Sequence, residues 1–142
     1  LQIIGDGEER QNLEKQVKSL NIQDKVSFLG YKDKNTLQNQ ILPSLDIFVN
    51  PSLQEGLPTT VIEALLAQCI VVATDVWGTR EISDKSDFIL VQPDDPDALI
   101  RGIRKVLIQL DAFWLSADMV REKFSRKKRI LQYADLYKLL CK

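Results

Sequence analysis

Short apolar runs alternate along this chain with longer stretches in which apolar residues recur at helical spacing. Five strands are predicted, at residues 1–4, 26–29, 46–49, 70–73 and 88–91. Helices are predicted between them, at residues 8–20, 34–44 and 60–67, with a short helical turn that ends at Ile82. The strands are mostly apolar throughout, so both of their faces are expected to be covered. This order predicts an α/β fold, a Rossmann-like doubly wound parallel sheet with helices on both sides.

After the last predicted strand, the chain shows helical patterns alone. Asp95 and Pro96 favour a helix start, because proline suits the first helical position, and this helix is expected to reach about residue 110. Two extra C-terminal helices are predicted at residues 112–123 and 125–140. The chain opens directly on an apolar strand, without an initiator methionine. We therefore expect residues 1–142 to form one domain of a longer protein, truncated on its N-terminal side.

Composition narrows the chemistry that this chain can perform. Its 142 residues are 44% hydrophobic and carry a formal net charge of −1, which suits one globular domain and gives no indication of a nucleic-acid partner. The absence of histidine excludes Ser-His-Asp and Cys-His catalysis and histidine-ligated zinc within the chain. Cys69 and Cys141 lie too far apart in sequence to suggest a disulfide framework. Two such cysteines suit a reducing cytosol, and no apolar run approaches the roughly 20 residues that a membrane span needs, so the sequence predicts a cytoplasmic protein.

Ligands of doubly wound sheets bind beyond the carboxyl ends of the strands, so the segments that follow the strands are the candidate sites. The first such segment contains Gly5, Asp6 and Gly7, and a helix is predicted after it. Glycine allows close backbone approach, and the amides of a helix start can meet a phosphate. Arg10, however, occupies the last glycine position of the dinucleotide-binding fingerprint. A phosphate-binding turn and a plain tight turn therefore both remain open.

A more specific pattern follows the third predicted strand, where seven residues separate Glu55 from Glu63. Glu55 is predicted on a flexible loop that contains Gly56 and Pro58, and Glu63 is predicted in the first turn of a helix. One carboxylate on a loop and one on a helix could hold a polar, phosphate-bearing ligand from two sides.

Two interpretations of Glu63 compete for the same carboxylate oxygens. Thr60 and Glu63 match the S/T-x-x-E capping box, in which the glutamate bonds back to the amide of the cap residue. Glu55 would then be an ordinary surface carboxylate. Alternatively, a helix start at Thr59 and Thr60 offers amides and hydroxyls to an anion. Glu63 would then accept two hydrogen bonds from a vicinal diol such as ribose.

Seven ordered segments resemble a known family. They are IIGDGEER, VSFLGY, DIFVNPS, EGLPTTVIEA, VVATD, GTREI and FSRKKRILQYADLY. In sequence and spacing they resemble the C-terminal, donor-binding domain of retaining GT-B glycosyltransferases of family four, the glycosyltransferase group 1 type. The resemblance covers nearly the whole chain. It implies the C-terminal half of a GT-B fold, and it implies a nucleotide diphosphate sugar, with UDP or GDP as the nucleotide, as the substrate.

The resemblance also implies a role for each matched residue. Glu55 would be the catalytic residue that contacts hydroxyls of the transferred sugar, and Glu63 would hold the ribose hydroxyls. The other donor-binding residues are Gly5, Gly7, Gly30, Tyr31, Lys32, Gly56, Leu57, Pro58, Thr59 and Thr60. The first two would line the cleft, the next three would lie near the nucleobase, and the last five would approach the diphosphate and sugar. No metal and no cofactor are expected, because the family is metal-independent.

Four positions depart from the family pattern. Gln68 and Ile70 stand where the family usually has glycine and proline, and Phe88 replaces a glycine. Without glycine at position 68, we expect the glycine-dependent ending of the preceding helix to be lost. Trp77 replaces the first residue of a Gly-Gly turn, and it either narrows the ligand pocket or packs into the protein.

The resemblance further implies parts that should precede Leu1. These are the first strand of the domain, the arginine and lysine that neutralise the departing diphosphate, and an N-terminal acceptor-binding domain. The chain alone is therefore not expected to transfer sugar. An epimerase or phosphorylase of related fold, and a non-catalytic binding module, remain alternatives. The basic run at residues 121–129 could contact an anionic membrane surface peripherally, or it could be a solvated helix face.

Overall fold

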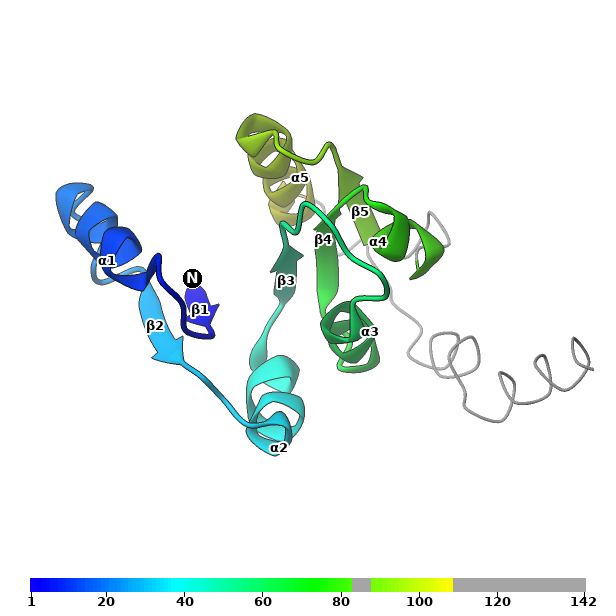
Figure 1. The fold of residues 1–142 in the computed structure, drawn as a ribbon, viewed down its shortest axis with the longest axis horizontal. Coiled ribbons are helices and arrows are strands. Elements are labelled where there is room, and N and C mark those ends of the chain that lie inside the picture. Colours follow the sequence, from blue (N-terminus) through cyan, green and yellow to red (C-terminus); the bar gives the residue numbers. More distant parts are fainter. Residues whose placement is uncertain (83–87, 109–142) are drawn as a thin grey trace, which may run out of the picture. The chain divides into compact units, whose positions relative to one another are not determined.

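The computed structural model describes residues 1–82 and 88–108 (Figure 1). The chain divides into two compact units, Leu1–Ile41 and a second unit that begins at Leu42, and each is described by itself. The helices predicted at residues 112–123 and 125–140, and the basic run at 121–129, lie outside the described residues. The single domain, its truncation and the membrane contact therefore stay predictions.

The first unit is a β-α-β element. Strand β1 (Gln2–Ile4), helix α1 (Arg10–Ser19) and strand β2 (Ser27–Gly30) follow one another, and the two strands pair in parallel. The ladder shifts by one residue at its end, so that Ile4 lies opposite Gly30. Gly30 adopts a φ of +67°, which glycine tolerates without steric cost. Both predicted strands are confirmed, and the first helix is shorter than the predicted range 8–20.

The single helix predicted at residues 34–44 is wrong, because three different turns replace it. Helix α2 (Lys34–Thr36) passes into the π-helical segment η1 (Leu37–Ile41) and then into the 3₁₀ segment η2 (Leu42–Ser44). Proline lacks the amide hydrogen that a regular α-helix needs at that position. Pro43 lies in η2, where the helix tightens before the next strand. Pro43 is therefore the residue in the sequence that signals the end of a regular helix here.

The second unit contains a parallel sheet in the order β3-β4-β5. Its strands are β3 (Ile47–Asn50), β4 (Ile70–Thr74) and β5 (Phe88–Val91), which match the predicted strands to within one residue. Its helices are α3 (Thr59–Leu66), α4 (Trp77–Ile82) and α5 (Pro96–Ile108). Asn50 pairs with Ala73 and Thr74 pairs with Val91. The segments that follow the three strands therefore start at the same edge of the sheet.

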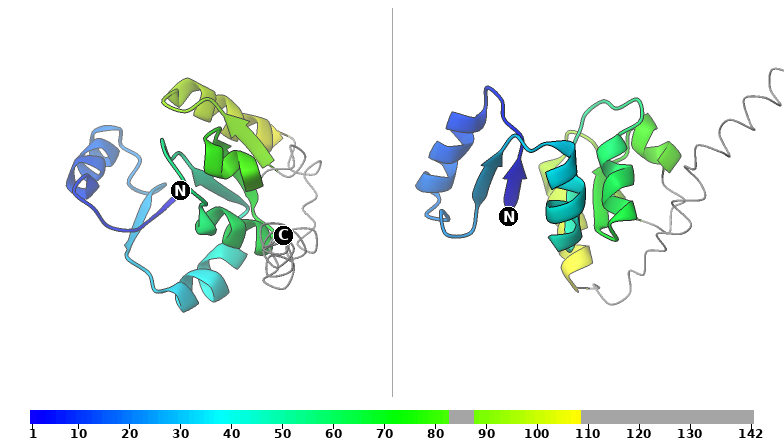
Figure 2. Two further views of the ribbon diagram at one scale, coloured as in Figure 1. Left: turned by 45° about the vertical axis from the view of Figure 1, so that its right-hand side comes forward. Right: turned by 90° about the horizontal axis from the view of Figure 1, so that it is seen from below.

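Helices cover both faces of this sheet, as expected for a doubly wound fold. Figures 1 and 2 show α3 and α5 on opposite sides of β4, all five residues of which are buried. Ile70, Val72 and Val91 pack with Ala98 and Val106 of α5 in one cluster. A Cβ on Gly102 would meet a methyl of Val91 at 2.7 Å, so glycine lets α5 lie close to the strands. The predicted α/β, Rossmann-like class is confirmed.

The start of α3 excludes one of the two interpretations of Glu63, the capping box. The helix begins at Thr59 with Pro58 as its N-cap residue, and no side chain caps it. The carbonyl of Pro58 accepts hydrogen bonds from the amides of Val61 and Ile62, at 3.1 and 3.4 Å. Thr60 is therefore already inside the helix, and the predicted capping box is wrong. Glu63 lies in the second turn, since the first turn of α3 contains no acidic residue, so its predicted place in the first turn is also wrong.

The C-terminal end of α3 keeps a turn that usually requires glycine. Gln68 adopts a φ of +66°, and its amide donates to the carbonyl of Leu65 at 3.0 Å. The amide of Cys69 donates to the carbonyl of Ala64 at 2.9 Å, which completes a Schellman motif. The predicted loss of this helix ending is wrong, because glutamine adopts the left-handed conformation in place of glycine.

Candidate functional site

The candidate site of the second unit is the edge of the sheet where β3 and β4 end. The loop at residues 51–58 leaves β3 and leads into α3, and two residues connect β4 to α4. Glu55 lies half-buried on the first of these connections. Glu63 lies half-buried in α3. The two glutamates are thus placed by one loop and the helix that directly follows it.

Hydrogen bonds hold the carboxylate of Glu55 to the end of β3. The Ser52 hydroxyl lies 2.8 Å from Oε1 of Glu55 and 2.7 Å from Oδ1 of Asn50. The amide of Ser52 also donates to Oδ1 of Asn50, at 3.3 Å. Asn50 is itself buried, with 8% of its surface exposed. Glu55 therefore has a defined hydrogen-bonding partner, which the prediction of a flexible loop did not include.

The backbone of the Glu55 loop packs directly on α4. The amide of Gly78 donates to the carbonyl of Glu55 at 3.2 Å. A Cβ added to Gly78 would lie 2.5 Å from the carbonyl oxygen of Gly56 and 2.7 Å from that of Glu55. A contact this short is not possible without moving the loop backbone. Gly78 therefore sets how closely the Glu55 loop can approach α4.

Two buried threonines stabilise the end of β4 and the turn after it, and the first of them also bonds to the Glu55 loop. The Thr74 hydroxyl donates to the carbonyl of Ser52. The Thr79 hydroxyl bonds to the carbonyls of Thr74 and Val76, and it accepts from the amide of Val76 at 3.2 Å. Both threonine side chains are buried, with 4% and 0% of the residue exposed. The turn after β4 is thus internally bonded and supports the loop beside it.

Sequence reasoning assigned no role to these supporting residues. They are Asn50, Ser52, Thr74, Gly78 and Thr79. All five lie inside the segments DIFVNPS, VVATD and GTREI, which the resemblance had already singled out. The available signal was therefore a polar or glycine residue at the end of a buried strand, or just beyond it.

The start of α3 presents exposed polar groups next to the Glu55 loop. Gly56 is exposed and has open space around its Cα, whereas Pro58 is buried. Thr59 and Thr60 are both exposed. As the first two residues of the helix, they have backbone amides with no acceptor inside it. Two hydroxyls and two such amides at the positive end of the helix dipole can bind an anion.

The family departures in this unit have different structural consequences. Ile70 and Phe88 are buried in the sheet, with 7% and 4% of their surfaces exposed. Trp77 is 75% exposed, and its indole nitrogen donates to Glu81. The alternative that Trp77 packs into the protein is therefore wrong. Three residues further along α4, Arg80 forms an ion pair with Asp75 at 2.7 Å.

In the first unit, Gly5 and Gly7 form a tight turn between β1 and α1. Gly5 has a φ of +117°, and its amide donates to the carbonyl of Gly30 at 2.9 Å. The amide of Gly7 donates to a carboxylate oxygen of Asp6, while its carbonyl accepts from the amide of Arg10. The turn is therefore stabilised by local bonds, as the plain-turn interpretation expects, and both glycines are exposed.

Arg10, which breaks the dinucleotide fingerprint, has a structural explanation. Its guanidinium pairs with Asp6 at 3.5 Å and with Glu14 at 3.0 Å. It also lies 5.9 Å from the ring centroid of Phe28, within the range of a cation–π contact. A Cβ on Gly30 would be 3.3 Å from this guanidinium. Arg10 thus braces the helix start against β2 at the position where the fingerprint has glycine.

The segment predicted to lie near a nucleobase follows β2. Tyr31 is 78% exposed, and Lys32 is half-buried. Asp33 caps α2 through bonds from the amide and hydroxyl of Thr36, at 3.0 and 2.6 Å. The hydroxyl bond is the main reason that the pKa of Asp33 is lowered. Gly30, Tyr31 and Lys32 belong to the first unit, whereas Glu55 and Glu63 belong to the second.

Comparison with known proteins identifies the family. The model of the family "Glycosyl transferases group 1" matches residues 1–109. The chain belongs to this family. One relative, the uncharacterised glycosyltransferase MJ1607 of Methanocaldococcus jannaschii, is 35% identical over 108 residues, which are 75% of this chain and 27% of that protein.

Two solved structures share the fold of this group 1 chain. Sucrose-phosphate synthase from Thermosynechococcus elongatus has a TM-score of 0.80 and 27% identity, over 99% of this chain and 38% of that one. The Anabaena Alr3699/HepE protein, solved in complex with UDP-glucose, has a TM-score of 0.80 and 21% identity, over 96% of this chain and 40% of that one. The chain thus spans well under half the length of these proteins.

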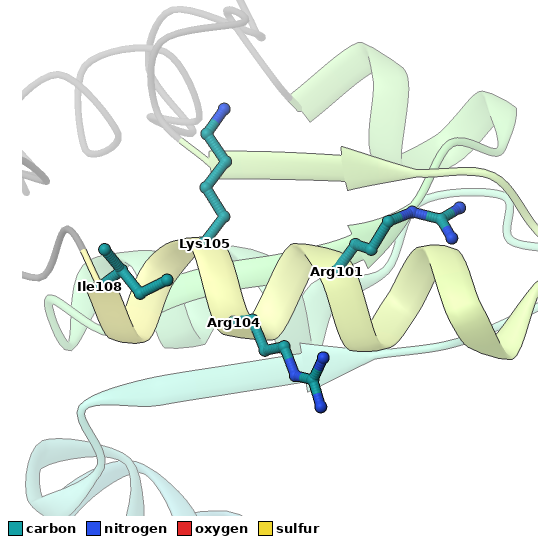
Figure 3. A pocket seen from close by; sticks show the side chains of 4 residues that line it. All are labelled: Arg101, Arg104, Lys105 and Ile108. Carbon is teal, nitrogen blue, oxygen red and sulfur yellow. The ribbon is translucent and has the colours of Figure 1, made fainter.

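A concave surface of this group 1 chain lies along α5, apart from the Glu55 loop. It has a volume of about 310 Å³ and is lined by Arg101, Arg104, Lys105 and Ile108 (Figure 3). Arg104 extends to the opposite side of the helix from Lys105, so the cations do not converge on one point. Arg101 also pairs with Asp95 at 3.5 Å. None of the residues expected to bind the donor lines this surface.

Cys69 is buried directly before the first residue of β4, at the end of that strand opposite the Glu55 loop. Its thiol lies 3.2 Å from the carbonyl of Leu42. Burial raises the pKa of Cys69 to about 11, and the nearby charge of Asp46 adds to the shift. The reactive thiolate is therefore scarce at neutral pH.

Within residues 1–82 and 88–108, there is no group of three or more histidine, cysteine, aspartate or glutamate residues that could hold a metal ion. Metal independence stays a prediction. Over the same part of the chain, no helix has both the length and the apolar character needed to cross a membrane.

Proposed function

We propose that this chain is the donor-binding half of a retaining glycosyltransferase. The whole enzyme would move a sugar from a nucleotide diphosphate sugar to a glycan or lipid-linked acceptor. The observation that carries this proposal is the arrangement of residues beyond the C-terminal end of β3. There, Glu55 is held by Ser52 and by α4, and the exposed start of α3 follows directly.

The chemistry of such a donor fits the groups at this edge. A diphosphate carries negative charge, which the amides and hydroxyls of Thr59 and Thr60 can meet at the helix start. Glu63, one turn further along α3, would accept the ribose hydroxyls. Glu55 would bind hydroxyls of the transferred sugar, where contacts that strengthen in the transition state increase the rate. The start of α3 has no side-chain cap, which excludes the capping box and leaves the ribose role of Glu63 for the binding test.

The relatives support a nucleotide sugar as the ligand. The Anabaena protein of the same fold was solved with UDP-glucose, so a UDP-linked or GDP-linked donor is the first choice for a binding test. The proposal also includes an acceptor-binding domain and cationic residues that this chain does not contain. Since the chain corresponds to 27% of its relative from Methanocaldococcus jannaschii, we expect it to bind the donor without transferring the sugar.

Calorimetry on the 142-residue chain tests the proposal. UDP, GDP and ADP, each with and without a linked sugar, are titrated into wild type and two variants. Glu63→Ala should weaken free nucleotide and sugar conjugate alike, by about tenfold, because it removes a charged acceptor from the ribose. Glu55→Ala should spare the free nucleotide and weaken only the conjugate. Asp97→Ala, an exposed carboxylate in the first turn of α5, is the matched control.

The outcomes separate the candidate functions. Equal effects of Glu55→Ala and Glu63→Ala on both ligands would contradict the assigned roles. If no nucleotide binds even at millimolar concentration, the chain is better described as a non-catalytic module that keeps the fold. Transfer of a labelled sugar by this chain alone would contradict the proposed division of the active site between two domains.

A further inference from the structure

Ser52 takes part in four hydrogen bonds that hold the Glu55 loop. Its hydroxyl reaches both Glu55 and Asn50, its amide donates to Asn50, and its carbonyl accepts from Thr74. From this geometry we infer that Ser52 is a positioning residue, which orients the carboxylate of Glu55 for the donor sugar. The inference rests on the proposed function and adds a residue to it.

The hydroxyl of Ser52 has one proton and two acceptors. Oδ1 of Asn50 is 2.7 Å away and Oε1 of Glu55 is 2.8 Å away. A hydrogen bond to an ionised carboxylate is stronger than one to a neutral amide. The proton therefore goes to Glu55 when that carboxylate is charged. Asn50 still accepts the amide of Ser52 at 3.3 Å, so the serine remains bound on its other side.

The orientation of the Asn50 side chain follows from the same contacts. A backbone amide can only donate, so the atom of Asn50 that faces Ser52 is its oxygen. The nitrogen Nδ2 then has no hydrogen-bond partner among the described residues, although it is buried. An unsatisfied buried donor is unfavourable. The stability of the core therefore does not by itself explain why an asparagine side chain is buried at position 50. Its hydrogen bonds to Ser52 do explain it.

The main chain on both sides of the Ser52–Glu55 bond is anchored. Thr74 holds the carbonyl of Ser52 to β4, and Gly78 holds the carbonyl of Glu55 to α4. The side-chain bond consequently joins two fixed points. A glutamate side chain that is already ordered loses less conformational freedom when the ligand binds. Ser52 thus prepares Glu55 for the sugar without touching the nucleotide.

The test compares Ser52→Ala and Ser52→Thr in the 142-residue chain, using the nucleotide and sugar conjugate that bind wild type. Ser52→Ala should weaken the conjugate by about tenfold while free nucleotide changes by less than about twofold, as expected for loss of one bond to a charged group. Ser52→Thr keeps the hydroxyl and should restore most of the affinity. In a Glu55→Ala background, where no acceptor remains at position 55, Ser52→Ala should add little, because the two residues act through one contact.

A readout without ligand makes the inference independent of the donor. Three-bond NMR couplings of the Glu55 side chain should report one rotamer in wild type and averaged rotamers in Ser52→Ala. Wild-type averaging, or couplings that Ser52→Ala leaves unchanged, would overturn the positioning role. Equal weakening of both ligands with lowered thermal stability would also overturn it, since it indicates a purely structural residue. If wild type binds no nucleotide, the proposed function fails, and the couplings alone decide the role of Ser52.

Discussion

Replacing Gly78 by alanine tests whether α4 sets the position of the Glu55 loop. Gly78 is buried, and it is not among the residues with positive φ. Alanine is therefore acceptable to the backbone of α4, and the perturbation is purely steric. The added methyl would lie 2.5 Å from the carbonyl oxygen of Gly56, against 3.4 Å or more in an ordinary contact. The loop carrying Glu55 must move by several tenths of an ångström to about 1 Å, as expected when a packed contact is overfilled.

The cost of this movement has two parts. Overpacking of a well-packed site lowers the free energy of unfolding by about 1–3 kcal/mol. The bond from the amide of Gly78 to the carbonyl of Glu55, at 3.2 Å, is stretched or lost, and a net hydrogen bond contributes about 0.5–1.5 kcal/mol. A displaced Glu55 should weaken binding of the sugar conjugate by about tenfold, since placement errors near 1 Å can cost two orders of magnitude in a reaction.

Urea unfolding and calorimetry measure the two effects on the same protein. Gly102→Ala is the matched control, because its methyl would also be crowded, at 2.7 Å from a methyl of Val91. That contact lies between α5 and the sheet and involves a side chain rather than the backbone of the loop. Both variants should lose stability, but only Gly78→Ala should change the ratio of conjugate to free-nucleotide affinity. A stable Gly78→Ala chain with wild-type affinities would refute the reasoning.

Two further predictions concern α3 and the strand that follows it. Gln68→Gly should raise the free energy of unfolding by about 1 kcal/mol in urea unfolding, because the φ of +66° strains glutamine but not glycine. The control Asn21→Gly should gain less, since asparagine tolerates its φ of +53°. An equal or larger gain for Asn21→Gly would contradict the explanation. In a Cys141→Ser chain, Cys69 should resist thiol reagents at pH 8 until the protein unfolds, because burial raises its pKa from 9.0 to about 11. Rapid labelling of the folded chain would instead show that Cys69 is accessible. The contribution of the Cys69 thiol to the free energy of unfolding is complete below about pH 9 and declines toward pH 11, because over this range the thiol ionises in the unfolded chain but not in the folded one.

The hydrophobic pattern was sufficient for the strands of both units. Residues 88–91 were predicted with the observed bounds, and Asp95 caps α5 through the amide of Ala98, as the Asp95 and Pro96 pair indicated. Strand bounds and helix caps of this kind are set by residues that are adjacent in the sequence, so they can be predicted from the sequence alone. Predictions failed where a local rule had a competitor. The helix at residues 34–44 contains Pro43, and the capping box at Thr60 yielded to a helix that begins one residue earlier.

By itself, the sequence determined the α/β class, the family and the segment that holds Glu55 and Glu63. Only the tertiary structure showed what holds Glu55 in place. Asn50 and Ser52 come from the end of β3 and the loop after it, whereas Gly78 comes from α4, and no periodicity or spacing connects them. The parallel pairing of β3 and β4 brings the ends of both strands to one edge of the sheet. There, hydrogen bonds and steric contacts join residues that are far apart in the sequence. The loop that looked flexible as a sequence is therefore an anchored one.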